Sequence, residues 1–502
     1  MKEKLLFFIL LIFTVSSCNN DDPIQIPARD DRFTEFSIKF DQAGDIVDFP
    51  GTIDTETGNV TIEIKNNKWI TNLDDAVAEF TTTGRVTIDD TEQISGITSN
   101  NFSNSLKYTI IDKGGRKRTY TIQVVCPQLS GLPVININTE DGKDVTDKEN
   151  YLTADFVLID REHPENNIEK QTGIRGRGNS TWAYDKKPYR LKFDKKTSLF
   201  GLGAAKSWVL LANYLDPTFI MNTIAFELGH RLEIPFTNHA NHVEVFLNNK
   251  YRGSYVLTEQ VQVNEHRVNI DEEKDFFVEL DSYFDEDIKF KSDILQLPVN
   301  IKSPEVDNIS EVEFVRTAIN ELEKLMFDPA SGFPHNNYLN LIDLNSLVNY
   351  ILVQEILANP EIRHPKSTYL YKEEGKKIMM GPLWDFDWGF GYREHGQEYF
   401  SNPTRLMFSS QMATDWIGDR FFSRFFEDPV FVSAYKKRWN EVKDRVAAIE
   451  AFIEAHEEYL EKSAIENNKL WSHNLEFTEQ IREMKTWMKA RINALDTHIN
   501  NL

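Results

Sequence analysis

The chain has 502 residues, of which 40% are hydrophobic and 27% charged, and its 79 acidic against 56 basic side chains give a formal net charge of −23. This is a globular balance with enough apolar residues for more than one core, and a length that suggests about two or three domains. The negative charge argues against nucleic acid as a partner, because a phosphate backbone needs a basic surface. Two cysteines exclude a disulfide scaffold and a cysteine-rich zinc site.

The first residues have the layout of a secretory signal. Lys2 and Lys4 precede an apolar run at 5–13, which is too short to cross a bilayer as a mature helix. Small residues then lead directly into Cys18, as in a bacterial lipobox. We expect residues 1–17 to be a lipoprotein signal peptide and Cys18 to carry the lipid; a plain signal peptide with an incidental Cys18 is the alternative.

Residues 18–32 read as a solvated tether, with Pro23, Pro27 and several charges. The acidic residues just after Cys18 also resemble an export signal that sends lipoproteins to the cell surface. The expected location is therefore the outer membrane, exposed at the surface or facing the periplasm. Contact with the membrane is expected through the lipid anchor only.

Residues 33–127 are predicted to form a small all-β sandwich. Val60, Ile62 and Ile64 alternate with polar residues, the pattern repeats at 120–124, and turn signals fall between the predicted strands. Short strands with regular turns are typical of a sandwich, and the segment resembles Ig-like leader domains. Without clustered histidines or paired acids, its expected role is that of a spacer or an interaction module.

After a predicted linker at 127–133 the pattern changes to an α+β domain over residues 132–495 with a helical C-terminal portion. Apolar residues at every second position indicate a strand, and apolar residues three or four positions apart indicate a helix. Strands are predicted at 134–138, 189–193, 243–247 and 255–257, and helices at 219–232, 310–326, 344–358, 430–460 and 478–495.

A glycine-rich stretch at 173–182 leads into a basic strand at 186–193. Glycines allow backbone N–H groups to approach an anion closely. Arg177, Lys187, Arg190 and Lys192 concentrate positive charge in an acidic protein, and alternation places Arg190 and Lys192 on one face of the strand. The pattern indicates either an anion-binding turn or a glycine-rich hairpin with a solvated basic face.

The segment 381–391 contains the strongest pattern for chemistry. Asp385 and Asp387 lie two residues apart and share one face if the segment is extended, with Trp384, Phe386 and Trp388 around them. Adjacent carboxylates in an aromatic shell repel each other unless a cation joins them. We predict a divalent cation, Mg²⁺ with phosphate being the common enzymatic case; a structural turn with one capping acid is the alternative.

Five segments in this order resemble the CotH kinase family: residues 175–182, 187–193, 208–216, 253–260 and 384–387. The resemblance spans about 132–495. It implies an atypical, minimal protein-kinase-like fold that uses ATP and Mg²⁺ or Mn²⁺ to phosphorylate serine or threonine. The expected acceptor is an exported or surface protein.

The resemblance also implies roles for single residues. Asp385 or Asp387 would bind the metal, and the basic strand would hold the phosphates, through Lys187 or Lys192 with Arg177 and Arg190 beside them. Glu259 would support that cation. Where the family has a catalytic Asp and a metal-binding Asn, this chain has Glu361 and Ser367.

Three functions therefore stay open. The first is an envelope-anchored Ser/Thr protein kinase, which the retained aspartates and basic residues favour. The second is a non-catalytic, pseudokinase-like binding module, which the exchange to Glu361 and Ser367 favours. The third is a surface scaffold or adhesion lipoprotein.

Overall fold

The computed structural model describes residues 31–42, 45–64, 73, 75–102, 104–125, 130–393, 398–409, 415–473 and 475–502. The predicted signal peptide, Cys18 and nearly all of the tether lie outside these residues. The chain divides into two compact units, one within 1–63 and 72–125 and the other dominated by 126–502. In the described part of the chain, no helix has the length and apolar character needed to cross a membrane.

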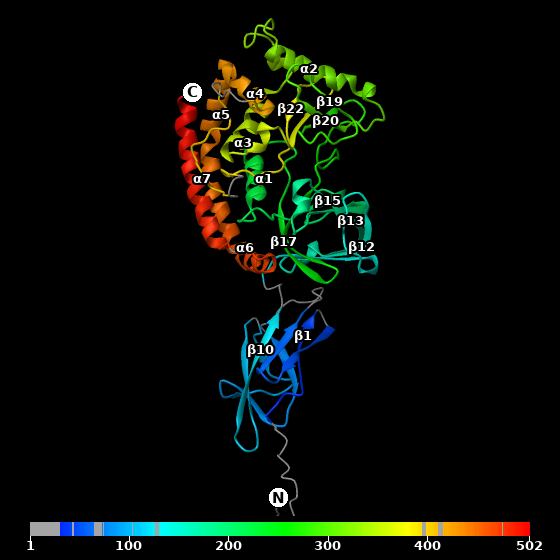
Figure 1. Cartoon of the computed structure of the whole chain (residues 1–502), viewed down its shortest axis with the longest axis vertical. Coiled ribbons are helices and arrows are strands. Elements are labelled where there is room, and N and C mark those ends of the chain that lie inside the picture. The colour runs from blue at the N-terminus through cyan, green and yellow to red at the C-terminus, as the bar shows by residue number, and fades with distance from the viewer. Residues whose placement is uncertain are drawn as a thin grey trace, which may run out of the picture. The chain divides into compact units, whose positions relative to one another are not determined.

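In its described residues the first unit contains strands and turns but no helix, as the alternating pattern predicts. A four-stranded sheet has the order β2-β1-β5-β8, and a six-stranded sheet has the order β3-β4-β10-β9-β6-β7. Strand β1 of the first sheet and strand β10 of the second are labelled in Figure 1. Phe36 on β1 and Tyr108 on β9 meet edge to face at 5.4 Å, so the two sheets share a buried core. The strands are β1 (Glu35–Gln42), β2 (Asp45–Pro50), β3 (Thr52–Asp54), β4 (Asn59–Glu63), β5 (Ala76–Thr81), β6 (Arg85–Ile88), β7 (Thr91–Glu92), β8 (Ser99–Asn100), β9 (Leu106–Ile111) and β10 (Lys117–Val125).

The second unit begins with a closed seven-stranded barrel in the order β11-β12-β13-β14-β15-β17-β16. The parallel pair β11–β16 closes it, with Val134 opposite Glu244. Buried apolar side chains such as Ile174, Leu191 and Trp208 pack together inside the barrel. The strands are β11 (Val134–Thr139), β12 (Leu152–Ile159), β13 (Ile168–Gly176), β14 (Tyr189–Thr197), β15 (Ala205–Leu211), β16 (Asn241–Leu247) and β17 (Lys250–Glu259).

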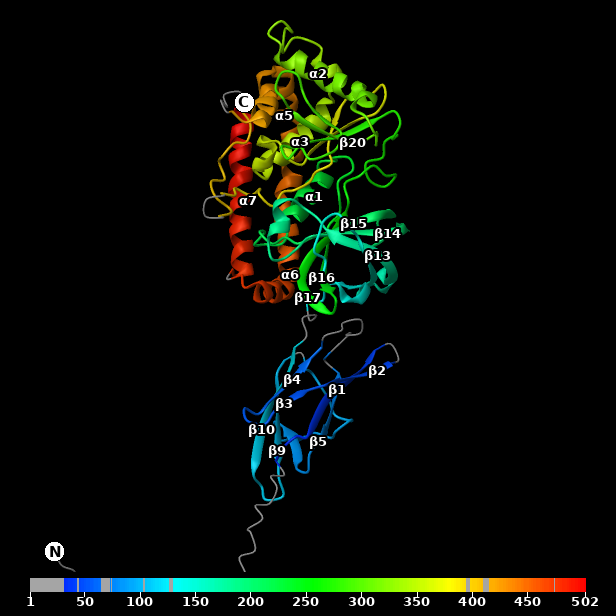
Figure 2. The same ribbon diagram turned by 45° about the vertical axis from the view of Figure 1, so that its right-hand side comes forward.

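A five-stranded sheet of order β19-β20-β18-β21-β22 and a set of helices make up the rest of this unit. Helix α5 packs on α3 and α7, and α6 packs on α7 and on β17, so the C-terminal helices reach back to the barrel (Figure 2). These elements are β18 (Phe276–Leu280), β19 (Lys289–Lys291), β20 (Pro298–Ser303), β21 (Thr368–Lys372), β22 (Met379–Met380), α1 (Met221–Arg231), α2 (Glu313–Phe327), α3 (Leu344–Ile356), α4 (Ile417–Ser423), α5 (Pro429–Ala447), α6 (Ile449–Trp471) and α7 (Phe477–Asn500).

The α+β class is confirmed, and the predicted helices at 219–232, 310–326, 344–358 and 478–495 match α1, α2, α3 and α7. One prediction is wrong in detail. The single helical stretch at 430–460 consists of two helices, because a turn at Ala448 (φ −66°, ψ −1°) separates α5 from α6. The apolar spacing continues across this break, so periodicity alone did not reveal it.

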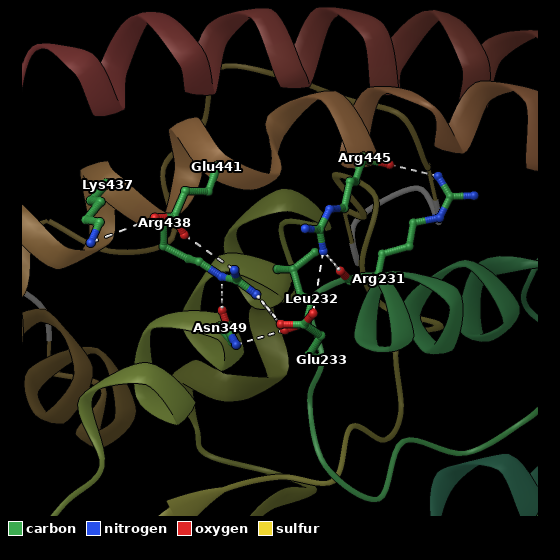
Figure 3. A network of polar contacts seen from close by, with 8 residues as sticks. All are labelled: Arg231, Leu232, Glu233, Asn349, Lys437, Arg438, Glu441 and Arg445. Atoms are coloured by element: carbon green, nitrogen blue, oxygen red, sulfur yellow. Dashed lines mark hydrogen bonds and ion pairs between the residues drawn. The ribbon is translucent and has the colours of Figure 1, made fainter.

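A buried amide joins three helices of the C-terminal portion (Figure 3). Asn349 on α3 donates to the Leu232 carbonyl at the end of α1 and accepts from Arg438 Nε on α5, at 2.8 Å each. Arg438 also donates to the Leu232 carbonyl and reaches Glu233. The side chain of Asn349 therefore satisfies polar groups from both neighbouring helices.

We predict that Asn349→Ala lowers the free energy of unfolding by about 1–3 kcal/mol, because it removes one of two donors to the Leu232 carbonyl and the acceptor of the Arg438 Nε–H. Chemical denaturation measures the change. Asn440→Ala on the exposed side of α5 is the matched control and should cost under ~0.5 kcal/mol. Equal costs for the two variants would contradict the role given to Asn349.

Candidate active site

A cavity of about 250 Å³ in the second unit is lined by residues of both the barrel and the five-stranded sheet. The barrel contributes the turn after β13 and the end of β15, and the sheet contributes β18, β20 and β21 with adjoining loops. Carboxylates outnumber cations in its lining. The acids are Glu279, Asp281, Asp285, Glu286, Glu361, Asp385 and Asp387, and the cations are Arg177, Lys186, Lys302 and Lys366.

The glycine-rich turn forms one wall of this cavity. The chain leaves β13 at Gly176, passes Arg177 and Gly178, and enters the short helical turn Ser180–Ala183. Gly178 has φ +82°, and a Cβ atom there would collide with the Thr181 hydroxyl. The glycine is therefore needed both for the backbone conformation and for the close return of the turn over the cavity.

The sequence predicts Mg²⁺·ATP as the ligand of this cavity. We predict that Gly178→Ala weakens its binding at least about tenfold, since the turn that lines the cavity must move away from Thr181. Calorimetric titration measures the dissociation constant. Gly201 has a similar φ of +70°, yet a Cβ there meets nothing within 4 Å. Gly201→Ala therefore carries the same backbone strain without the collision, and unchanged affinity in this control is expected. Equal losses in both variants would refute the argument.

Asp385 and Asp387 both line the cavity, so the structure brings the predicted acid pair to the predicted glycine turn. The backbone around them is fixed: Asn222 accepts from the Phe386 N–H at 2.8 Å, and Tyr399 donates to the Asp387 carbonyl at 2.8 Å. Burial and the neighbouring Asp385 carboxylate raise the pKa of Asp387 well above its ordinary value. The pair is thus electrostatically unfavourable until a cation compensates it.

Glu361 and Ser367 come to the same place from the loop between α3 and β21. Glu361 is 6% exposed, and its Oε2 has no hydrogen-bond partner in the structure. Burial and the charges of Asp385 and Asp387 raise the pKa of Glu361 well above normal. The Ser367 hydroxyl donates to Asp385 Oδ2 at 3.4 Å, which joins the two predicted metal-binding positions.

Only one of the predicted phosphate-binding cations lines the cavity. Arg177 lines the cavity and lies over the Trp384 ring at 5.3 Å. Lys187 instead donates to the Trp182 carbonyl at 2.8 Å, and Arg190 donates to the buried Ser207 hydroxyl on β15 at 3.4 Å. Neither of these two lines the cavity.

Lys192 and Glu259 also lie apart from the acid pair. Lys192 lies over Tyr151 in a separate depression on the barrel. Glu259 accepts from His239 at 2.7 Å in another depression and supports none of the predicted lysines. The cationic strand therefore contacts the cavity through its preceding turn rather than along its length.

The sequence reasoning missed an ion pair at the back of the cavity. Lys302 on β20 lies 3.3 Å from Glu279 on β18 and also contacts Glu286. Burial raises the pKa of Glu279 to about 7, against the opposing effect of Lys302. The sequence did contain a signal for this pair. Strands β18 and β20 are mainly apolar and each contains one charged residue, and such a charge is rarely buried without a partner.

The residues present fit a divalent cation. In the described residues no three His, Cys, Asp or Glu side chains form a ready-made metal site. Mg²⁺, however, is usually held by one or two carboxylates together with substrate phosphates and waters. Asp385 and Asp387 would supply the carboxylates. Glu361, which lines the same cavity, adds a buried Oε2 that has no hydrogen-bond partner among the described residues.

A comparison with protein-family models matches the CotH kinase protein family over residues 174–495. The chain belongs to the CotH kinase family. The match begins inside β13 and ends in α7, so it contains every residue that lines the cavity. The CotH region thus includes the glycine turn, the acid pair and the buried ion pair, and leaves the β-sandwich outside.

No curated protein matches the chain. One solved structure, a candidate secreted protein from Bacteroides fragilis, shares 19% identity with this CotH-family chain. The alignment covers 19% of this chain and 94% of the other, with a TM-score of 0.16.

Proposed function

We propose that this CotH-family protein is a Mg²⁺- or Mn²⁺-dependent protein kinase that transfers the γ-phosphoryl group of ATP to serine or threonine of exported proteins. One observation carries the proposal. One cavity is lined by the turn with Arg177 and by Glu361, Asp385 and Asp387, although some two hundred residues of sequence separate the turn from these acids. Positioning and charge neutralisation are what phosphoryl transfer requires of a protein.

Each group has a distinct role in this proposal. Asp385 and Asp387 would hold the metal, which neutralises charge on the phosphates when bound. Arg177, which lies over Trp384 beside Asp385, would orient a phosphate. Glu361 is buried beside them, and its free Oε2 would accept the proton of the acceptor hydroxyl.

The acceptor needs room beside this site. A second cavity of about 500 Å³ shares Tyr214 and Leu215 with the first. Its presence supports a protein segment, rather than a small molecule alone, as the acceptor. Envelope anchoring through Cys18, with surface exposure, is part of the same proposal and rests on the sequence.

A non-catalytic binding module is the second candidate, and the residues at 361 and 367 favour it. A glutamate is one methylene longer than the aspartate usual in the family, and a serine hydroxyl is a weaker metal ligand than an amide carbonyl. In that case the cavity would bind metal and nucleotide without turnover.

The deciding experiment uses the chain from residue 28 onward, labelled ATP, Mg²⁺ or Mn²⁺ and a generic protein acceptor. Metal-dependent label transfer to serine or threonine supports the kinase. A rise in melting temperature with metal and nucleotide but without transfer supports the binding module. The absence of both effects would refute both proposals and leave a scaffold.

A further inference from the structure

The cations that line the active-site cavity differ in what already holds them. Lys302 is paired with Glu279 and Glu286. The Lys186 ammonium donates to the Ser254 carbonyl and to Asn467 Oδ1, and burial lowers its pKa to about 7. Both lysines are therefore engaged by the protein itself.

Lys366 is held in another way. Its ammonium lies 4.7 Å from the centre of the Tyr283 ring and 5.1 Å from that of Trp388. Within the described part of the chain these ring faces are its side-chain contacts, and it forms no ion pair there. Ring faces attract an ammonium group but accept no conventional hydrogen bond, so its three N–H donors stay available to an anion.

The backbone around Lys366 is fixed on both sides. The Lys366 N–H donates to the Glu361 carbonyl at 3.0 Å, and the Thr368 hydroxyl donates to the Lys366 carbonyl at 3.0 Å. The next N–H, of Ser367, donates to Asp281 Oδ2 at 3.3 Å. The backbone of Lys366 is therefore fixed, and the rings of Tyr283 and Trp388 define where its ammonium lies. Such preorganisation is what transition-state stabilisation needs.

The composition of the cavity lining agrees with this placement. Lys366 shares the lining with Asp281, Glu361, Asp385 and Asp387. A positive charge with free donors among these acids is placed to neutralise a phosphoryl group bound there.

We propose that Lys366 is a further catalytic residue, whose ammonium binds the oxygens of the phosphoryl group in transit, with Tyr283 and Trp388 as positioning residues. The inference rests on the proposed phosphoryl transfer. In that step the acceptor oxygen forms a bond to the γ-phosphorus while the bond from the γ-phosphorus to the bridging oxygen breaks. The electron pair of the broken bond leaves with ADP, the hydroxyl proton passes to Glu361, and Lys366 keeps its protons throughout.

The first test is kinetic. Lys366→Met is expected to lower kcat about 10²–10³-fold, the usual cost of removing one transition-state donor, with the KM for ATP changed less than about threefold. Lys366→Arg should recover at least about tenfold of the loss because it restores the charge. Lys376→Met, at an exposed lysine paired with Glu373, should behave as wild type. A Lys366→Met enzyme with unchanged kcat would overturn the proposal.

The second test needs no turnover. Mg²⁺·ADP with aluminium fluoride mimics the phosphoryl group in transit, and the wild type should bind ADP at least about tenfold more tightly when the fluoride is present. Lys366→Met should lose that gain but keep its affinity for ADP alone. If fluoride still raises the ADP affinity of the variant, or does not raise that of the wild type, the role of Lys366 is overturned. A gain without any label transfer would instead refute the kinase activity and leave Lys366 as the phosphoryl-binding group.

Discussion

Asp385→Asn is expected to lower phosphoryl transfer about 1000-fold or more. The variant removes one of the two carboxylates that would hold the metal, and an ion that neutralises phosphate charge stabilises the transition state by several kcal/mol. The side chains of Asp385 and Asp387 contact each other, and the Ser367 hydroxyl donates to Asp385, so the amide can keep the local packing. Initial rates at saturating Mg²⁺ and ATP measure the loss.

The melting temperature makes this prediction specific. Without metal, Asp385→Asn should melt no lower than the wild type, because it removes repulsion within the acid cluster. Added Mg²⁺ should stabilise the wild type and have little effect on the variant. Asp185→Asn, at an exposed aspartate near the glycine turn, should resemble wild type in both assays. Full activity of Asp385→Asn would rule out the metal-binding role.

Arg491→Met is expected to give the largest loss of stability, about 3–5 kcal/mol. Arg491 on α7 is fully buried and lies 2.6 Å from Glu355 on α3. It also donates to the Pro403 and Arg405 carbonyls at 2.9 and 2.5 Å. Removing one member of a buried ion pair leaves an uncompensated charge, which is far more costly than losing a surface pair.

The control for this prediction is the exposed pair of Arg482 and Glu479 on the same helix. Arg482→Met should change the free energy of unfolding by less than about 1 kcal/mol. A second variant, Arg491→Met with Glu355→Gln, should recover part of the loss because the unpaired charge is gone. Denaturant unfolding that gives Arg491→Met and Arg482→Met similar costs would contradict this account.

Local patterns were sufficient for much of the fold. The alternation at 60–64 predicted a strand of the sandwich, and helical spacing predicted α1, α2, α3 and α7 nearly to their ends. Closure of the barrel was beyond such patterns, since it depends on parallel pairing of β11 with β16 about a hundred residues later. Long-range pairing leaves no periodic signal in either strand.

The candidate site shows the same division. Asp385, Asp387 and the glycine turn were identified because their residue types are unusual together, and the cavity contains all of them. The lysines that line the cavity were not identified, because alternation places Lys192 on one face of its strand but does not show what that face contacts. In the structure that face lies beside Tyr151, whereas Lys302 and Lys366 reach the cavity from elements that only tertiary folding brings there.

Crystals of the protein grown with Mn²⁺ and a non-hydrolysable ATP analogue would test the central claim directly. Anomalous scattering should place manganese within about 2.5 Å of a carboxylate oxygen of Asp385 or Asp387. The triphosphate should extend from there toward Arg177 and Lys366. Manganese bound elsewhere, or a nucleotide that contacts neither the aspartates nor Arg177, would show that this cavity is not the site of phosphoryl transfer.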